Sequence, residues 1–408
     1  MQVVVIGGGA AGFFAAISCR QHHPDAHIRI LEKSTKLLSK VRISGGGRCN
    51  VTHACFNQKE LAAHYPRGER FLRKSFSKFF TQDTVDWYES RGVLLKTESD
   101  GRMFPQSNRS ETIVDCLMSE AEKGGIRIDL NSPVKALTPK NDKILLTLGN
   151  DESLEVDQVI IATGGSPKKE GLHWLEKLGI PIQNPVPSLF TFNLPGQAIT
   201  SLMGLSVPDA WVRISGSKLS SSGPLLITHW GVSGPGVLKL SALGARELAD
   251  RNYQFNALIS WVGSIREDDL RQQLSSFKQE NPSKKLHRQP LGLPKRLWSY
   301  LLDRIDLRED ENWGDLSRKK MNRLVNLLLN DEYEVRGKTT FKEEFVTCGG
   351  VDLKSVSPFT LESKTVPNLY FAGEVLDIDG VTGGFNFQAA WTTGFLAGKL
   401  QGKNDPEK

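Results

Sequence analysis

The stretch Val3-Val4-Val5-Ile6-Gly7-Gly8-Gly9-Ala10-Ala11-Gly12 decides the fold of this 408-residue chain. Its β-branched start is typical of a strand that is buried on both faces. The glycines follow at once, and an apolar helix is expected over residues 13–19. A second strand is expected over residues 27–31, and the acid Glu32 comes directly after it.

This order of strand, glycine turn, helix, strand and acid predicts a nucleotide-binding unit. Gly7 permits the tight turn, Gly9 lets a diphosphate approach the backbone, and Gly12 lets the helix pack closely on the strand. The positive end of the helix favours a pyrophosphate, and Glu32 is placed to accept hydrogen bonds from ribose hydroxyls. A glycine-rich turn without a ligand is the alternative, and it leaves the acid in register unexplained.

The composition is that of an ordinary globular protein with two or three domains, since 39% of residues are hydrophobic and 24% charged. The chain has no apolar run near the ~20 residues that span a bilayer. The N-terminus is a strand without a basic segment, so it is not expected to be a signal peptide, and the cytoplasm is the expected compartment. The net charge of +6 is compatible with an anionic partner, such as a nucleotide or RNA, without requiring one.

The five cysteines argue against metal and disulfide chemistry. Their number is odd and none form C-x-x-C; they are Cys19, Cys49, Cys55, Cys116 and Cys348. A disulfide framework, a zinc site and a redox pair are therefore disfavoured, and no metal site is expected.

A second glycine-rich stretch follows Lys40 and reads Ile43-Ser44-Gly45-Gly46-Gly47-Arg48-Cys49-Asn50. Three glycines between cations indicate backbone that is brought close to a flat or anionic ligand, although a flexible surface loop is the alternative. A further small-residue segment, Ala162-Thr163-Gly164-Gly165, ends the strand expected at residues 158–161 and again permits close approach of a ligand.

The middle of the chain has a different character. Three prolines in residues 181–187 predict a crossover between domains. Residues 188–262 are expected to be largely β, with one helix that starts after Ser233 as N-cap and Pro235 in the first turn.

Residues 264–333 are expected to form helices with charged faces. Their cations could form a basic patch, although a solvated face is favoured. These cations include Lys284, Lys285, Arg288, Lys295, Arg296, Arg318, Lys319, Lys320 and Arg323.

The last segment returns to the character of the first. Leu369-Tyr370-Phe371-Ala372-Gly373-Glu374 predicts a strand that ends in glycine and an acid. The pair Gly383-Gly384 then opens a helix and forms a second helix terminus suited to an anion or a carbonyl. The two ends of the chain are therefore expected to form one domain, with residues 187–340 inserted.

Together these motifs resemble the two-dinucleotide-binding-domain flavoproteins, and more narrowly the BaiN-like (YhiN-like) family. The resemblance covers almost the whole chain. It is carried by the Ile43–Asn50 stretch, Thr228-His229-Trp230-Gly231-Val232-Ser233-Gly234-Pro235, Val346-Thr347-Cys348-Gly349-Gly350-Val351 and Gly373-Glu374-Val375-Leu376-Asp377. It implies an α/β fold in which a discontinuous Rossmann-type domain binds FAD. The implied segments are 1–186 and 346–408 for the FAD domain, 187–263 plus 334–345 for a β-barrel-like insert, and 264–333 for a small helical insert.

The resemblance also implies the cofactor contacts. The first glycine turn holds the pyrophosphate, Glu32 the adenosine ribose with Lys33 beside it, and the Val134 backbone the adenine. The implied set is Gly7, Gly8, Gly9, Ala10, Ala11, Gly12, Glu32, Lys33, Lys40, Ser44, Gly45, Gly46, Gly47, Arg48, Cys49, Asn50, Val134, Thr163, Gly164, Gly373, Glu374, Gly383, Gly384, Phe385 and Asn386. Relatives often have a longer glycine-rich segment where this chain has residues 166–171, so the shape of the substrate approach stays open.

The implied function is that of an FAD-dependent oxidoreductase that transfers two electrons as a hydride. The helix that opens at residues 384–386 is expected to stabilise negative charge on the reduced flavin and to raise its potential. No second G-x-G-x-x-G follows a strand, so NAD(P)H is expected only as a transiently docked reductant.

Three classes of function stay open at this point. The substrate is either a small molecule or a uridine of ribosomal RNA, which is converted to dihydrouridine. The small molecule is either an amine that is oxidised or a compound whose activated double bond is reduced. A flavin-binding scaffold without activity is the third. Cys49 and His229 are weak candidates for the proton donor, because a packed cysteine and a structural histidine are each more common.

Overall fold

The structure, a computed structural model, describes residues 1–340 and 346–401. The chain divides into two compact units. The first unit comprises Met1–Ser188 together with the segment from residue 341 to the C-terminus, and the second comprises Leu189–Thr340. The predicted insert boundary at residues 341–345 and the predicted domain end at 402–408 lie outside the described residues.

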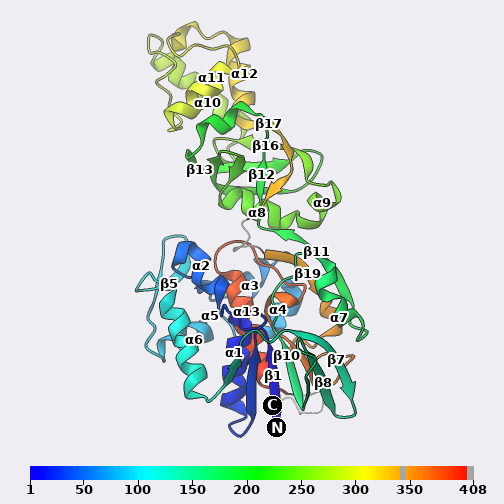
Figure 1. Cartoon of the computed structure of the whole chain (residues 1–408). Helices are drawn as coiled ribbons and strands as arrows, with labels where there is room; N and C mark the ends of the chain where they lie inside the picture. The colour runs from blue at the N-terminus through cyan, green and yellow to red at the C-terminus, as the bar shows by residue number, and fades with distance from the viewer. Residues whose placement is uncertain (341–345, 402–408) are drawn as a thin grey trace. The chain divides into compact units, whose positions relative to one another are not determined.

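The first unit is built on a five-stranded parallel sheet with the order β20-β10-β1-β2-β6, of which Figure 1 labels β10 and β1. Its strands are β1 (Gln2–Ile6), β2 (His27–Leu31), β6 (Arg127–Asp129), β10 (Gln158–Ile161) and β20 (Leu369–Phe371). The C-terminal strand β20 pairs with β10, so the two ends of the chain share one sheet. The predicted α/β fold with a discontinuous Rossmann-type domain is confirmed.

Two helices from opposite ends of the chain, α1 (Ala10–His22) and α13 (Phe385–Gly398), pack against each other in this unit. Gly394 and Gly398 permit the close approach, because a Cβ there would lie 2.7 Å from the Ala11 carbonyl oxygen and 2.3 Å from that of Ala15. The other helices are α2 (Ser39–Gly47), α3 (Gln58–Ala63), α4 (Glu69–Ser75), α5 (Thr81–Glu89), α6 (Glu111–Lys123) and α7 (His173–Glu176), with 3₁₀ turns η1 (Lys169–Leu172), η4 (Leu353–Ser355) and η5 (Gly373–Val375).

Three small antiparallel sheets complete the first unit. The first has the order β3-β5-β4 and the second β7-β8-β9, while β11 pairs with β19. Their strands are β3 (Thr52–His53), β4 (Leu95–Thr97), β5 (Arg102–Pro105), β7 (Val134–Lys140), β8 (Lys143–Leu148), β9 (Ser153–Val156), β11 (Ile182–Ser188) and β19 (Val346–Val351). The proline-rich segment expected as a crossover thus forms a strand, and a register shift between Gln183 and Val186 accommodates Pro185.

The second unit contains a seven-stranded antiparallel sheet with the order β17-β16-β13-β14-β15-β12-β18. Its strands are β12 (Thr191–Asn193), β13 (Ser206–Ile214), β14 (Ser220–Thr228), β15 (Gly231–Ser233), β16 (Gln254–Ser260), β17 (Asp331–Arg336) and β18 (Lys338–Thr339). Its helices are α8 (Pro235–Leu243), α9 (Ala245–Asp250), α10 (Glu267–Glu280), α11 (Lys295–Asp303) and α12 (Arg318–Leu329), with 3₁₀ turns η2 (Ala198–Leu202) and η3 (Trp313–Asp315). Gly234 is the N-cap of α8, so the prediction of Ser233 as N-cap is wrong: Ser233 still belongs to β15, and Gly234 at φ +94° makes the turn.

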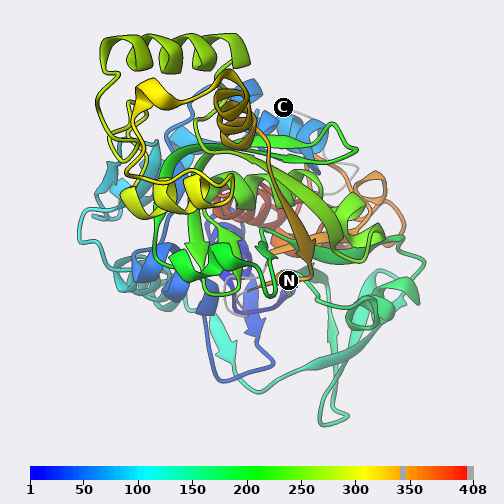
Figure 2. The same ribbon diagram turned by 90° about the horizontal axis from the view of Figure 1, so that it is seen from above.

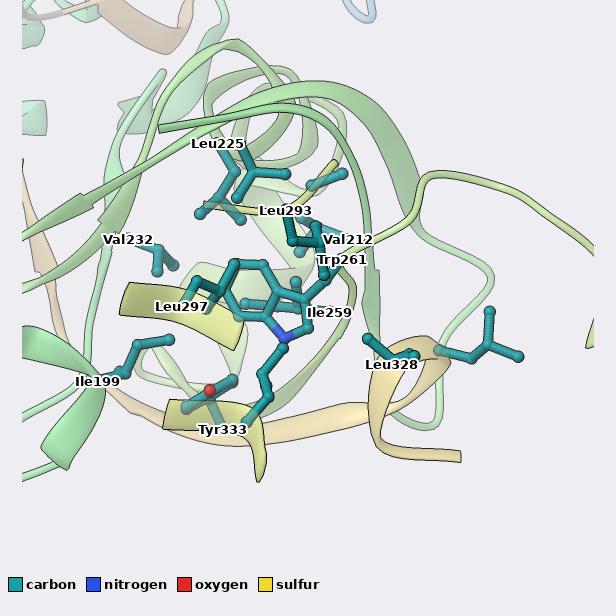
Figure 3. Packing of buried hydrophobic residues seen from close by; sticks show 14 of the residues in the cluster. Ile199, Val212, Leu225, Val232, Ile259, Trp261, Leu293, Leu297, Leu328 and Tyr333 are labelled. Carbon is teal, nitrogen blue, oxygen red and sulfur yellow. The ribbon is translucent and has the colours of Figure 1, made fainter. Parts of the chain in front are cut away.

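One hydrophobic core joins the sheet and the helices of the second unit. Figure 2 shows the yellow-green to yellow helices of residues 267–329 grouped together beside the green strands. At the centre of this core Trp261 lies among Ile259 of the sheet, Leu297 of α11 and Leu328 of α12 (Figure 3). Its indole N–H donates to the buried carboxylate of Asp331 at 2.8 Å. Within the described ranges, no helix combines the length and apolar character needed to cross a bilayer.

Candidate flavin site

The first glycine turn has one packed side and one open side. Gly7 has φ +114°, and its N–H donates to the Leu31 carbonyl at 2.8 Å. A Cβ on Gly12 would lie 1.9 Å from the Gly7 carbonyl oxygen, so α1 touches the turn directly. At Gly9, in contrast, a Cβ would meet no atom of the described residues within 4 Å, and none of their side chains caps α1. The buried Gly8 and the first-turn residues Ala10 and Ala11 complete the turn, whose open side and helix N-terminus fit a diphosphate.

Glu32 is held at the end of β2 by three hydrogen bonds. One carboxylate oxygen accepts from the Gly8 N–H at 2.8 Å, and the other accepts from the N–H and hydroxyl of Ser34 at 2.9 and 2.8 Å. The Ser132 N–H donates to the Glu32 carbonyl at 2.8 Å, and Val134, at the start of β7, follows two residues after Ser132 in the chain. Lys33 is exposed beside it. The structure therefore brings together the predicted contacts for adenosine.

The second glycine stretch is a broken helix, not a plain loop. Ser44 interrupts α2 with ψ 149°, and Gly45 and Gly46 are left-handed with φ +59° and +69°. Gly47 and Cys49 are also left-handed, at φ +81° and +60°. The Cys49 N–H donates to the Ser44 carbonyl at 3.0 Å, which closes the turn. Only glycine adopts the left-handed conformation at several successive positions at low cost, so this conformation accounts for the Gly-Gly-Gly run.

Arg48 and Cys49 anchor this turn to the first unit. The Arg48 guanidinium pairs with the Glu98 carboxylate at 2.6 Å and lies over the Phe104 ring, 4.1 Å from its centroid. The Cys49 side chain has no exposed surface, and burial raises its thiol pKa to about 12. A neutral, inaccessible thiol fits a packing role better than proton transfer.

Three distant segments meet at Glu374. Its carboxylate pairs with the Lys40 ammonium at 2.5 Å and accepts from the Thr347 N–H at 2.8 Å. A Cβ on Gly165 would lie 2.7 Å from the same carboxylate. Gly165 ends the predicted Ala162–Gly165 segment, in which Thr163 is exposed and Gly164 has φ +77°. Gly373, at φ +75°, completes the 3₁₀ turn with Glu374.

The start of α13 is bound to the second glycine stretch. Gly384, at φ +98°, is the N-cap of α13, and its N–H donates to the Asn50 amide oxygen at 2.9 Å. In this orientation of the Asn50 amide, its nitrogen also donates to the Thr52 and Met103 carbonyls. The Asn386 amide donates to and accepts from the Gly380 backbone at 3.0 and 2.8 Å. Within the described part of the chain, no side chain caps α13. Two of the predicted flavin-contacting segments, 44–50 and 383–386, are therefore neighbours.

Residues that the sequence did not indicate also support this helix start. Phe385 stacks against the rings of both His53 and His64, with centroid distances of 4.7 and 4.2 Å, and the two histidine rings are 6.0 Å apart. His53 Nδ1 lies 3.0 Å from the Gly383 carbonyl and donates to it, and the Tyr65 hydroxyl donates to the Phe385 carbonyl at 2.6 Å. Isolated histidines and tyrosines carry no periodic signal, so only the fold identifies them.

A buried ion pair fixes the loop that precedes α13. Arg67 binds both carboxylate oxygens of Asp379, which is fully buried and also accepts from the Ser188 hydroxyl at 2.6 Å. Burial raises the pKa of the Asp379 carboxyl, whereas the Arg67 charge lowers it.

The second weak candidate for a proton donor, His229, belongs to the second unit, where it is exposed and contacts Trp230 edge-on at 4.1 Å.

Comparison with known proteins identifies the family. Residues 1–400 match the family described as HI0933-like protein Rossmann domain. The chain belongs to this family. Among its relatives, a ribosomal RNA dihydrouridine synthase of Haemophilus influenzae is 29% identical over 405 residues, which cover 96% of each chain. A 3-dehydro-bile acid delta(4,6)-reductase of Clostridium scindens is 25% identical over 407 residues and 98% of each chain.

Solved structures agree with the fold. The 3-ketosteroid-delta4-(5alpha)-dehydrogenase of Rhodococcus jostii has a TM-score of 0.52 and 13% identity, with 98% of this chain and 96% of that chain covered. The 408-residue chain described here belongs to the HI0933-like family and is an FAD-dependent oxidoreductase with a Rossmann-type FAD-binding domain. The open side of the glycine turn and the tethered Glu32 fit that cofactor.

Proposed function

We propose that this enzyme reduces the C5–C6 double bond of a uridine in ribosomal RNA, with NAD(P)H as the electron donor. The observation that carries the proposal is the similarity to two relatives that bear the same name. The ribosomal RNA dihydrouridine synthases of Haemophilus influenzae and Escherichia coli are 29% and 28% identical to this chain, and each comparison covers 96% of both chains.

The third relative supports the reaction type. The name 3-dehydro-bile acid delta(4,6)-reductase describes the reduction of double bonds conjugated to a ketone. The C5–C6 bond of uracil is likewise conjugated, to the C4 carbonyl. In the uridine a hydride adds to C6, the carbon far from the C4 carbonyl, and a proton adds to C5 beside it. One uridine, one NAD(P)H and one proton therefore give one dihydrouridine and one NAD(P)⁺.

Bound FAD supplies the hydride carrier for this step. The residues of the chain then have separate proposed tasks. The turn Gly7–Gly12 binds the diphosphate, Glu32 binds the adenosine ribose, and the broken helix at residues 44–50 lines the flavin. The N-terminus of α13 at Gly384 stabilises the negative charge that reduction brings. The tethering of Glu32 by Gly8 and of Gly384 by Asn50 supports this assignment.

The proton that completes the reaction does not come from Cys49 in this proposal. Burial raises the pKa of that thiol to about 12 and leaves it no exposed surface, so it is a weak and inaccessible acid. The target base must leave its stack to reach the flavin. The proposal takes the cytoplasm as the compartment of this reaction.

The test is a map of dihydrouridine in ribosomal RNA from a deletion strain. We expect one modified position to disappear and to return when the wild-type gene is supplied. The same gene with Gly9→Ala, which closes the open side of the turn, should fail to restore it. An unchanged map, together with reduction of small conjugated ketones by the purified enzyme, would replace RNA by a metabolite as the substrate.

A further inference from the structure

A cavity of about 250 Å³ lies in the second unit between α10 and α12. Two helices and the residue that follows η3 supply its walls. It is lined by Arg271, Ser275 and Lys278 of α10, by Leu316, and by Arg318, Met321 and Asn322 of α12. Its volume is below the roughly 300 Å³ at which pockets for drug-sized ligands begin, so it suits a small group and not a whole cofactor.

The lining of this cavity is cationic. Among the described residues that line it, three side chains carry a positive charge and none carries a negative one. The Lys278 ammonium donates to the Leu316 carbonyl at 2.5 Å, and no carboxylate of the described residues pairs with it. Arg318 is exposed and likewise has no ion pair within the described ranges. Only Arg271 has an acidic partner, Glu267, at 2.7 Å.

The rest of the lining suits a phosphate that is joined to a sugar. Ser275 and Asn322 can hydrogen-bond to phosphate or ribose oxygens. Leu316 and Met321 are buried and form an apolar wall. The Ser317 side chain caps α12 by accepting from the Lys320 N–H at 3.2 Å, so the positive end of a twelve-residue helix also faces this region.

We infer that the cavity binds a phosphodiester group of the RNA strand and so anchors the substrate through the second unit. The inference rests on the proposed RNA substrate and assigns to it a binding site apart from the flavin residues. Two other cations of the helical segment are neutralised locally, since Lys320 pairs with Glu311 at 2.7 Å and Arg323 with Asp306 at 3.2 Å. Lys278 and Arg318 line one cavity together, and this distinguishes them from exposed cations of the same segment such as Lys284 and Lys319.

The experiment measures RNA binding by the FAD-loaded enzyme over a series of salt concentrations. The variants are Arg318→Gln, Lys278→Gln and the double variant, and the probe is a fluorescent ribosomal RNA fragment. Arg323→Gln is the matched control, because it removes the same charge from the same helix outside the cavity. Thermal unfolding and flavin absorption verify that each variant is folded and loaded.

Each lost phosphate contact should lower the slope of log K against log salt by about 0.7–0.9. At 0.15 M salt this weakens binding roughly fivefold for each single variant and roughly thirtyfold for the double variant. Arg318→Lys should retain most of the affinity, and Arg323→Gln should change it less than about twofold.

Unchanged affinity in the folded double variant would overturn the inference. So would an equal loss in the Arg323→Gln control, or binding of wild-type enzyme to phosphatidylglycerol vesicles but not to RNA. The map of dihydrouridine decides the proposed function separately. If the deletion strain keeps its dihydrouridine while the cavity variants lose RNA affinity, the reaction is wrong and the site stands.

Discussion

A pair of alanine substitutions in one turn separates packing from cofactor binding. Gly9→Ala places a methyl group where no atom of residues 1–340 or 346–401 lies within 4 Å, at a φ of −92° that alanine adopts freely. Gly12→Ala places the same methyl group 1.9 Å from a backbone carbonyl oxygen. The two changes add identical atoms three residues apart but in different surroundings. Gly12→Ala should therefore destabilise the flavin-free protein, whereas Gly9→Ala should leave its stability unchanged and weaken FAD binding.

The magnitudes follow from these surroundings. Gly12→Ala overpacks rigid backbone, so we expect a loss near the upper end of the usual range, about 3 kcal/mol. For a domain of this size that lowers the unfolding temperature by roughly 6–12 °C. Gly9→Ala should leave the unfolding temperature of the apoprotein within about 2 °C. Because its methyl group keeps a diphosphate from the backbone, it should cost about 1.5–3 kcal/mol of binding, or roughly tenfold to a hundredfold in Kd for FAD.

The assay uses apoprotein prepared by removal of the flavin. Calorimetry gives the unfolding temperature of each variant, and quenching of FAD fluorescence on titration gives the Kd. If Gly9→Ala binds FAD as tightly as wild type, the diphosphate does not approach this face of the turn, and the assignment of residues 7–12 fails. If Gly9→Ala instead lowers the unfolding temperature as much as Gly12→Ala, the open space at Gly9 is not real.

Three further outcomes are expected. Asp331→Asn leaves the Arg304 guanidinium without its buried partner and should destabilise the second unit by about 3 kcal/mol in denaturant unfolding. Burial raises the pKa of the Cys19 thiol from 9.0 to about 12, so above pH 9 the folded protein keeps a proton that the unfolded chain loses. The free energy of unfolding therefore has its full contribution from this thiol below pH 9 and falls by up to about 1.4 kcal/mol per pH unit above it. Cys19→Ala should reduce that fall between about pH 9 and 10.5. Gly384→Ala forces a Cβ to within 2.5 Å of the Thr52 carbonyl oxygen, displaces the start of α13 and should lower the potential of bound FAD by the equivalent of about 1 kcal/mol in spectroelectrochemical titration. An unchanged potential with flavin still bound would show that this helix does not tune the cofactor.

The parts of the fold that local sequence determines were predicted well. The strands at residues 27–31 and 158–161 have the predicted bounds, because runs of β-branched residues between turn residues leave little choice of ends. The helix of residues 385–398 begins at the glycine pair, as expected. The proline-rich segment 182–188 was harder, because prolines usually exclude a strand, and here a register shift admits them.

The candidate site was predicted as a set of segments and not as a network. Glycine motifs identify which backbone comes close to a ligand, since few other residues permit that geometry. They do not indicate that Lys40 pairs with Glu374, 334 residues away, or that Arg67 and Asp379 form a buried pair. Such partners depend on where the sheet brings distant loops, and no periodicity in a single chain encodes that.

These distant pairs have a consequence for how the cofactor and the fold depend on each other. The Thr52 hydroxyl donates to Gln388 at 2.6 Å, the Trp391 indole donates to the Val51 carbonyl at 2.9 Å, and both bonds join β3 and its neighbour to α13. They form only when the C-terminal segment has returned to the first unit, which requires closure of a loop of more than three hundred residues. A ligand that contacts both the first turn and the start of α13 binds only the closed form and stabilises it in proportion to the logarithm of its concentration. FAD should therefore raise the stability of contacts between the two ends of the chain more than that of β2 with β6, which a hydrogen-exchange comparison of apoprotein and holoenzyme resolves directly.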